Sequence, residues 1–278
     1  MGTDVKIDSK YLLKDNTVKM FFVSLLSFAL RWGGIIGYGF LVYQFVFGSF
    51  LEYFSVENNI FLLGGGIIIL SILGLLVLQF SSAVKLGECS VYSRKSKYNR
   101  CKIRGLFCFF SPEKSIKALM LYVKLNALKI LWFGFFMTPC IMFYLVIFYV
   151  RTFVTESDFL FYTMVFLASV MFSFSLFMWR ASLGRYALAP LLVCKNTDLK
   201  SSVAINRSIE ETDGYLVENV ILENSLLGWL LSCIFVIPII YVVPYWKLCK
   251  IQFIQAKTKK KKENTLVYST NFYEIKEG

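Results

Sequence analysis

Side chains that could carry out catalysis or bind a metal are scarce in this sequence. It contains no His, which excludes His-based triads, His general bases, HExxH zinc sites and the common haem ligands. Its seven Cys show no CxxC spacing, and no Walker loop, GxGxxG or GxSxG motif is present. We therefore predict that the protein is not an enzyme and holds no metal or cofactor.

The remaining polar side chains of interest are charged residues within or beside apolar stretches. In lipid such a charge costs about 2.5–3.5 kcal/mol at the centre of a helix, so it marks either a structural ion pair or a path for ions or protons. The candidates for intramembrane or interfacial positions are Arg31, Arg180, Arg185, Glu218, Glu223, Lys247 and Lys250. Ion pairing is the favoured interpretation for Glu223 and Lys250.

The elements that must position these residues are membrane helices. The chain has 278 residues, of which 57% are hydrophobic and 17% charged, and its mean hydropathy is +0.61. About 20 residues of helix cross a hydrocarbon core about 30 Å thick. Apolar stretches of this length lie near residues 20–50, 60–84, 130–150, 159–179 and 220–254. They predict an all-α fold, a polytopic transmembrane helical bundle with residues 1–278 as one integral membrane domain.

The last apolar stretch is long enough for two crossings. A single crossing would leave the lysine-rich tail 257–278 outside, against the preference of basic residues for the cytoplasm. Pro238 and Pro244 supply a break, so we predict about six spans, the last two forming a Pro-broken hairpin. With a turn near Pro238, Glu223 lies about 22 Å and Lys250 about 18 Å from the turn along the helix axes. Because these two distances are similar, the side chains could pair.

Charge asymmetry gives the orientation. Residues 85–129 hold eleven Lys and Arg against two Glu, which predicts that this segment is cytoplasmic. The loops 51–59 and 151–158 are acidic and face outward. Both termini, including a polar cytoplasmic tail over 257–278, then lie on the cytoplasmic side of the cell membrane.

The basic segment 85–127 offers a contact for lipid. A cluster there could bind anionic headgroups of the inner leaflet at about 1 kcal/mol per residue, or could serve only to set topology. Its members are Arg94, Lys95, Lys97, Arg100, Lys102 and Arg104. Residues 113–127 place Ile116, Leu119, Met120 and Val123 on one helical face, which fits an in-plane amphipathic helix or an extension of the third span. A protein partner or homo-oligomer is compatible with this segment, whereas nucleic acid is not expected because the basic residues flank apolar spans.

Two features of the first apolar stretch bear on its placement. If the span begins at Trp32, Arg31 lies at headgroup level and residues 18–30 form a lipid-surface or tilted extension; otherwise Arg31 lies deep and needs an acidic or carbonyl partner. Gly33 and Gly37 have GxxxG spacing, which predicts close helix packing within the chain or, second, dimerisation.

Part of the chain resembles a known family. The relevant residues are Arg185, Tyr186 and Pro190 at a span end, Ser208 and Gly214 in the following loop, Ser225, Gly228 and Trp229 in NSLLGW, and Pro244 with Tyr245. Over Arg180 to Gln255, about a quarter of the chain, the pattern resembles the bacterial integral membrane family called domain of unknown function 975. The resemblance implies a six-span helical membrane protein without an assigned activity. The sequence departs from the family at Lys247 and Lys250, where the last helix is usually more apolar.

Two classes of function are compatible with these observations. The favoured one is a non-catalytic, multi-pass envelope, scaffold or accessory protein. The alternative is a small-solute or ion transporter, in which Arg31, Glu223, Lys247 or Lys250 would line the path.

Overall fold

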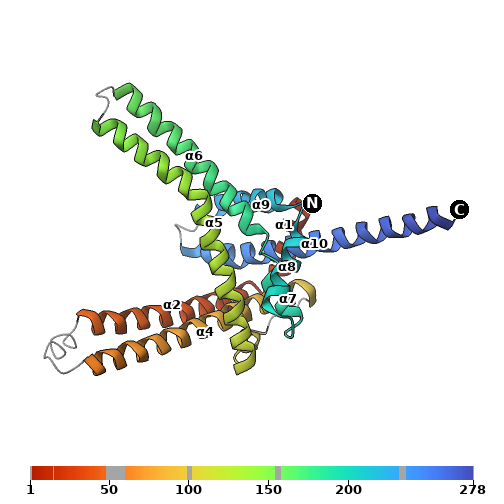
Figure 1. The fold of residues 1–278 in the computed structure, drawn as a ribbon. Helices are drawn as coiled ribbons and strands as arrows, with labels where there is room; N and C mark the ends of the chain where they lie inside the picture. Colours follow the sequence, from red (N-terminus) through yellow and green to blue (C-terminus); the bar gives the residue numbers. More distant parts are fainter. Residues whose placement is uncertain are drawn as a thin grey trace.

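The protein is all-helical over the residues that its computed structural model describes, which are 2–14, 16–47, 60–98, 102–153, 158–231 and 236–277 (Figure 1). The helices are α1 (Gly2–Lys14), α2 (Thr17–Phe47), α4 (Ile60–Tyr98), the short 3-10 helix η1 (Ile103–Phe107), α5 (Pro112–Phe153), α6 (Asp158–Gly184), α7 (Ala189–Lys195), α8 (Ser201–Thr212), α9 (Leu216–Leu231) and α10 (Val236–Glu277).

Four of these helical stretches are long and apolar enough to cross a membrane. Within the described ranges they are Thr17–Phe47, Gly64–Ser96, Pro112–Phe153 and Asp158–Lys195. Because each exceeds 30 residues, each is longer than the roughly 20 residues that a bilayer requires. The expectation of an all-helical fold with helices that could span a membrane is therefore confirmed, and each of these stretches is longer than one crossing needs.

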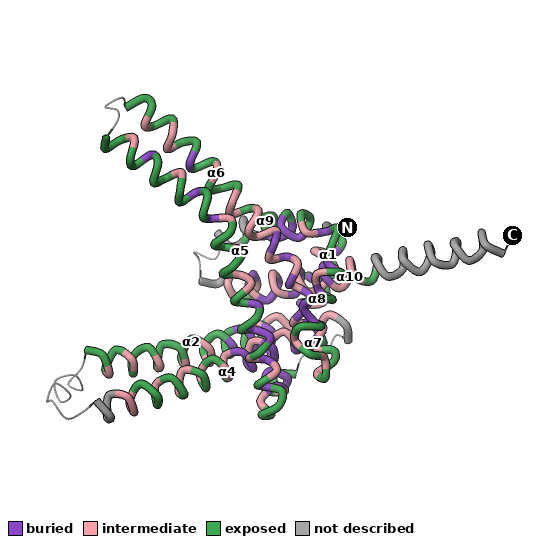
Figure 2. Tube along the Cα trace, in the orientation of Figure 1, coloured by how far each residue is buried: buried purple, intermediate pink, exposed green. Residues whose placement is uncertain are grey.

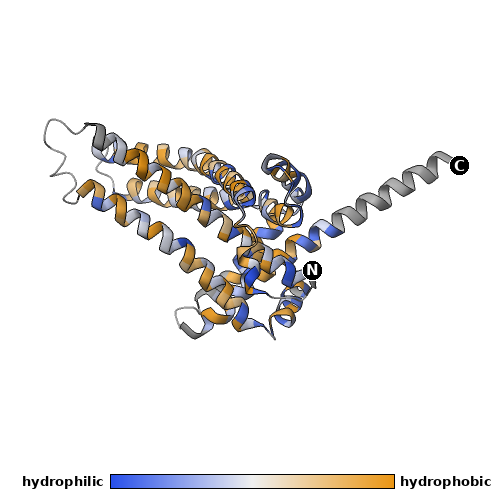
Figure 3. Ribbon diagram, turned by 90° about the horizontal axis from the view of Figure 1, so that it is seen from below, coloured by the Kyte–Doolittle hydropathy of each residue, from blue (hydrophilic) through white to orange (hydrophobic). Residues whose placement is uncertain are grey.

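The long helices pack as two pairs that share a base. Helix α2 packs against α4, and α5 packs against α6. In Figure 1 the two pairs diverge from a region that contains α1, α7, α8, α9 and the middle of α10. We call this region the base, and we call the parts of α2, α4, α5 and α6 that extend away from it the arms. Figure 2 shows that buried residues gather at the base, whereas the arms are largely exposed. The exposed residues of the arms are mostly apolar (Figure 3), as expected for surfaces that face lipid instead of water.

The base has two main hydrophobic clusters. The first joins α1, α2, α4, α9 and α10 through residues such as Leu13, Met20 and Leu248. The second joins α4, α5, α7 and α8 around Leu86 and Leu121. Helix α4 contributes to both clusters, so it is one of the elements that connect the two pairs.

The helices extend past the ends that hydropathy predicts. Helix α4 continues to Tyr98, so the first part of the basic segment 85–127 continues the helix of the second apolar stretch. Residues 113–127 belong to α5, which makes them an extension of the third span and excludes a separate in-plane helix. Their buried face carries Ala118, Leu121 and Leu125, whereas Ile116 and Met120 of the predicted apolar face are exposed. That prediction fails because α4 and α8 pack against a different face, which also carries Tyr122.

Helix α2 is continuous through Arg31. Within residues 18–30, Met20, Val23, Ser24 and Ser27 are buried in the base, whereas Phe22 and Phe28 are exposed. A methyl group added at either of the GxxxG residues, Gly33 and Gly37, would meet nothing within 4 Å, so close packing within the chain at these two residues is not observed.

Helices α9 and α10 are antiparallel neighbours. Ion pairs join Glu218 to Lys257 and Glu223 to Lys250, so residue numbers rise along one helix as they fall along the other. The connecting residues 232–235 lie outside the described ranges. Pro238 is in the first turn of α10, where proline is tolerated, but Pro244 is inside the helix and does not end it. Pro139 likewise lies inside α5, which continues past it.

We predict that Gly87→Ala destabilises the base. A Cβ at Gly87 of α4 would lie 1.9 Å from the Leu106 carbonyl oxygen, so α4 and η1 would have to separate. The expected loss of unfolding free energy is about 1–3 kcal/mol, measured by denaturation in mixed detergent micelles. Gly65→Ala in the same helix is the matched control, because nothing lies within 4 Å of its Cβ position. Equal stability of the two variants would contradict the close approach.

Candidate functional site

A buried carboxylate, Glu88 of α4, joins three helices at the base. Its side chain accepts hydrogen bonds from Ser27 Oγ at 2.8 Å and Ser24 Oγ at 3.3 Å, both from α2. Lys247 of α10 donates to Glu88 Oε1, and Arg31 Nη2 of α2 lies 3.8 Å from Oε2. Glu88 is only 6% exposed. A buried carboxylate of this kind needs such partners, because an unpaired charge in the interior would cost several kcal/mol.

Arg31 therefore has both kinds of partner that a deep placement requires. Besides Glu88, its Nε donates to the Ser27 carbonyl oxygen at 3.1 Å. Trp32 beside it is half exposed, so the two neighbouring side chains face different surroundings. Tyr92 extends the polar network, since its hydroxyl lies 2.6 Å from Ser24 Oγ and donates to the Met20 carbonyl at 3.2 Å.

A second carboxylate, Glu223 of α9, has the same arrangement of partners. Lys250 of α10 donates to Glu223 Oε1, and Arg180 Nη2 of α6 lies 3.4 Å from Oε2. Glu223 is 9% exposed. The Glu223–Lys250 pair that helix rise predicts is thus present, and it has an additional partner in Arg180. Each buried glutamate is held between one Arg from a long helix and one Lys from α10.

The two lysines lie three residues apart on α10. Residues with this spacing share one helical face, so Lys247 and Lys250 project from the same side of α10. Lys247 reaches the α2–α4 pair through Glu88, whereas Lys250 reaches Glu223 and, through it, α6 of the other pair. Helix α10 consequently links both pairs by charged contacts.

Serine and glutamine side chains continue the seam between α4 and α10. Ser96 Oγ donates to Gln255 Oε1 at 3.0 Å, and Gln255 Nε2 donates to Ser93 Oγ at 3.2 Å. Together with Glu88 and Lys247, these contacts show that α4 and α10 run parallel. The seam explains why α10 stays at the base beyond its apolar segment.

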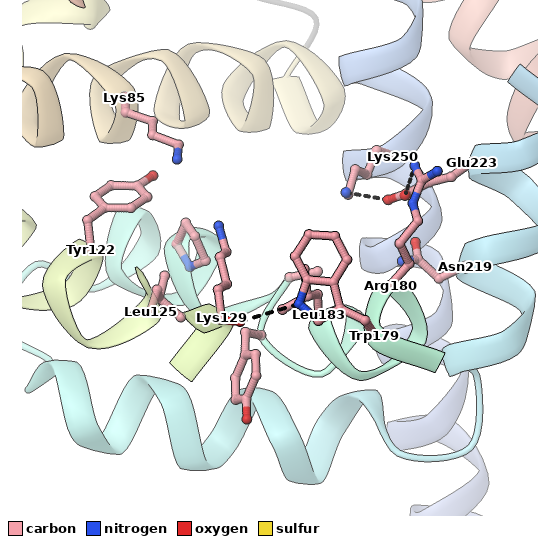
Figure 4. Close-up of a pocket in the computed structure, with 14 residues that line it drawn as sticks. Lys85, Tyr122, Leu125, Lys129, Trp179, Arg180, Leu183, Asn219, Glu223 and Lys250 are labelled. Atoms are coloured by element: carbon pink, nitrogen blue, oxygen red, sulfur yellow. Dashed lines mark hydrogen bonds and ion pairs between the residues drawn. The ribbon is translucent and has the colours of Figure 1, made fainter. Parts of the chain in front are cut away.

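A cavity of about 460 Å³ lies beside the Glu223 cluster, where α4, α5, α6, α9 and α10 meet. Lys85, Lys129, Arg180 and Lys250 line it together with Glu223 and Asn219. Figure 4 shows the ammonium groups of Lys85, Lys129 and Lys250 directed toward the same space. The Lys85 ammonium also lies 4.6 Å from the centroid of the Tyr122 ring.

The other residues predicted at intramembrane or interfacial positions, Arg185 and Glu218, contact neighbouring helices. Arg185 lies over the Trp132 ring, with 5.9 Å from Cζ to the centroid, and its carbonyl accepts from Ser208 Oγ at 2.6 Å. Glu218 pairs with Lys257. Trp132 Nε1 donates to the Tyr186 hydroxyl at 2.8 Å. The residues that suggested a family resemblance near Arg185 thus fix α6 against α5 and α8.

The basic cluster is only partly available to lipid. Arg94, Lys102 and Arg104 are exposed, as a headgroup contact requires. Lys95 is 1% exposed and is therefore wrongly predicted as a headgroup contact, because α4 continues as helix and turns this side chain into the base. The Lys97 side chain and Arg100 fall outside what the structure describes.

Among the described residues, no three or more His, Cys, Asp or Glu side chains form a group that could hold a metal ion. Cys89, Cys108, Cys140, Cys194 and Cys249 are free thiols. Burial raises the pKa of the Cys108 thiol, so it stays protonated and poorly nucleophilic at neutral pH. Cys101 and Cys233 lie outside the described residues.

Comparisons of the chain with family models, with curated proteins and with solved structures give no match.

Sequence reasoning identified Glu223 and Lys250 but missed Glu88 as the partner of Lys247. Glu88 lies 159 residues from Lys247, in the segment whose basic residues predicted a cytoplasmic position. The signal that could have located it is the apolar Ala83, Val84 and Leu86 just before it, which indicate a helix that continues inward.

We predict that Glu88 and Lys247 are energetically coupled. Glu88→Gln leaves two cations without their carboxylate, and Lys247→Met leaves Glu88 with the more distant Arg31 as its cation, so each single variant is destabilised. The double variant should lose less than the sum, with a coupling of about 0.5–3 kcal/mol in a double-mutant cycle of unfolding free energies. The exposed pair Lys117–Asp198 is the control, with about 0.2–1 kcal/mol expected. Additive effects for Glu88 and Lys247 would show that the contact is not stabilising.

Proposed function

We propose that this chain is a six-span membrane protein with both termini in the cytoplasm, and that it serves as a non-catalytic envelope, scaffold or accessory protein. In this arrangement α2, α4, α5 and α6 each cross once, and α9 with the apolar part of α10 enters as a hairpin. The antiparallel contact of α9 and α10 supports the hairpin. The exposed Arg94, Lys102 and Arg104 support a cytoplasmic base.

The observation that carries the functional proposal is that the charged side chains are already bound in ion pairs within the protein. A carrier needs charged groups that can exchange partners with a solute, and the candidates were Arg31, Glu223, Lys247 and Lys250. All four form ion pairs that join different helices. Charges used in this way hold helices together, which suits a protein that presents a stable polar surface beneath the membrane.

The basic cavity favours one second candidate, a transporter for a small anionic solute. Lys85 and Lys129 lie in that cavity at the level where α4 and α5 pass from apolar to polar sequence. Such a transporter would need this cavity to open alternately to the two sides of the membrane.

Site-specific photocrosslinking in cells tests the scaffold proposal. A photoreactive residue at Arg94 or Lys102 should give one discrete protein adduct in good yield, because both positions are exposed on the proposed cytoplasmic surface. The control position is Phe174, exposed on the apolar arm of α6, where no discrete adduct is expected. Movement of an anionic solute by the purified protein in liposomes, without any adduct at Arg94 or Lys102, would overturn the proposal in favour of the transporter.

A further inference from the structure

The cavity beside Glu223 is more basic than its ion pairs require. Of the described residues that line it, Glu223 alone carries a carboxylate, against the four cations Lys85, Lys129, Arg180 and Lys250. Arg180 and Lys250 both bind Glu223. Lys85 and Lys129 make no ion pair with any described residue, and Lys85 has only the Tyr122 ring as a cation–π partner.

We propose that this cavity binds a phosphate group, with Lys85 and Lys129 as its principal contacts. The four cations and one carboxylate that line the cavity leave a net charge of +3, which suits a group with one or two negative charges and three or four acceptor oxygens. Ammonium groups act as point charges toward phosphate and need no fixed planar geometry. The Trp179 indole, which donates to the Lys129 carbonyl at 3.3 Å, holds the backbone of that residue in place.

The size and position of the cavity define the ligand class. At about 460 Å³ it lies within the range of sites for small organic molecules, which exceeds the need of an inorganic phosphate ion. It lies at the polar ends of apolar helices, the depth at which phospholipid headgroups occur. A phosphate ester fits these features, whether it is a lipid headgroup such as phosphatidylglycerol or a soluble phosphate ester.

The test uses the purified full-length protein in two arms. In one arm the protein is placed in phosphatidylcholine nanodiscs, and inorganic phosphate and glycerol 3-phosphate are titrated at constant ionic strength while the thermal midpoint is followed. In the other arm, nanodiscs that contain phosphatidylglycerol are used, and retained lipid is counted by native mass spectrometry. The variants are Lys85→Met, Lys129→Met and the pair combined. Lys124→Met, an exposed lysine of the same helix α5, is the matched control.

We expect saturable binding to the unmodified protein in at least one arm. Stabilisation by a titrated phosphate identifies a soluble source, and retention of phosphatidylglycerol alone identifies a lipid source. The combined Lys85→Met and Lys129→Met variant should bind about tenfold more weakly or worse, whereas Lys124→Met should bind as the unmodified protein does. Absence of saturable binding in both arms, or equal binding by the combined variant, would overturn the proposal.

The thermal stability of the variants without ligand provides an independent check. Removal of two uncompensated ammonium groups relieves repulsion, so the combined variant without ligand should unfold at the same temperature as the unmodified protein or higher. A midpoint that falls further than it does in the single Lys85→Met variant, which loses only the contact with the Tyr122 ring, would show that Lys129 also has a structural partner and would contradict the proposal. The result does not depend on whether the protein acts as a scaffold, because binding is measured without a protein partner.

Discussion

The structure depends on two buried glutamates whose lysine partners both lie on helix α10. Glu88 and Glu223 bind Lys247 and Lys250, which project from the same face of α10. Each glutamate also has an arginine from a long apolar helix, Arg31 or Arg180. A buried charge is costly unless opposite charges and hydrogen bonds satisfy it. These contacts therefore specify where α10 lies relative to both helix pairs.

The rest of the architecture follows from the different surroundings of the apolar arms and the polar base. The arms of α2, α4, α5 and α6 expose apolar side chains, which is stable only in contact with lipid or another apolar surface. In lipid there is little hydrophobic gain from helix association, so packing and polar contacts must hold the helices together. The base supplies these contacts through the glutamate clusters, the Ser–Gln seam and two apolar clusters.

Hydropathy and charge predict much of this fold but not its tertiary contacts. The long apolar helices are predictable because lipid permits few alternatives for a chain of this composition. The Glu223–Lys250 pair is predictable because it depends only on helix rise about a nearby turn. Glu88–Lys247 and the burial of Lys95 are not, since both require knowledge of which helices meet at the base. The ends of α4 and α5 were also missed, because polar helical extensions carry no hydropathy signal. The likeness to the family called domain of unknown function 975 stays a prediction, since no family model matches the chain.

Pulsed electron spin resonance tests the role of the α10 lysines most directly. Spin labels at Ile68 on α4 and Val170 on α6, both exposed, report the separation of the two helix pairs in a background without the native cysteines. We predict a narrow distance distribution for this protein and for the Lys124→Met control, and a broad or displaced one when Lys247 and Lys250 are both replaced by Met. An unchanged, narrow distribution in the doubly substituted protein would contradict the conclusion that these two lysines hold the helix pairs together.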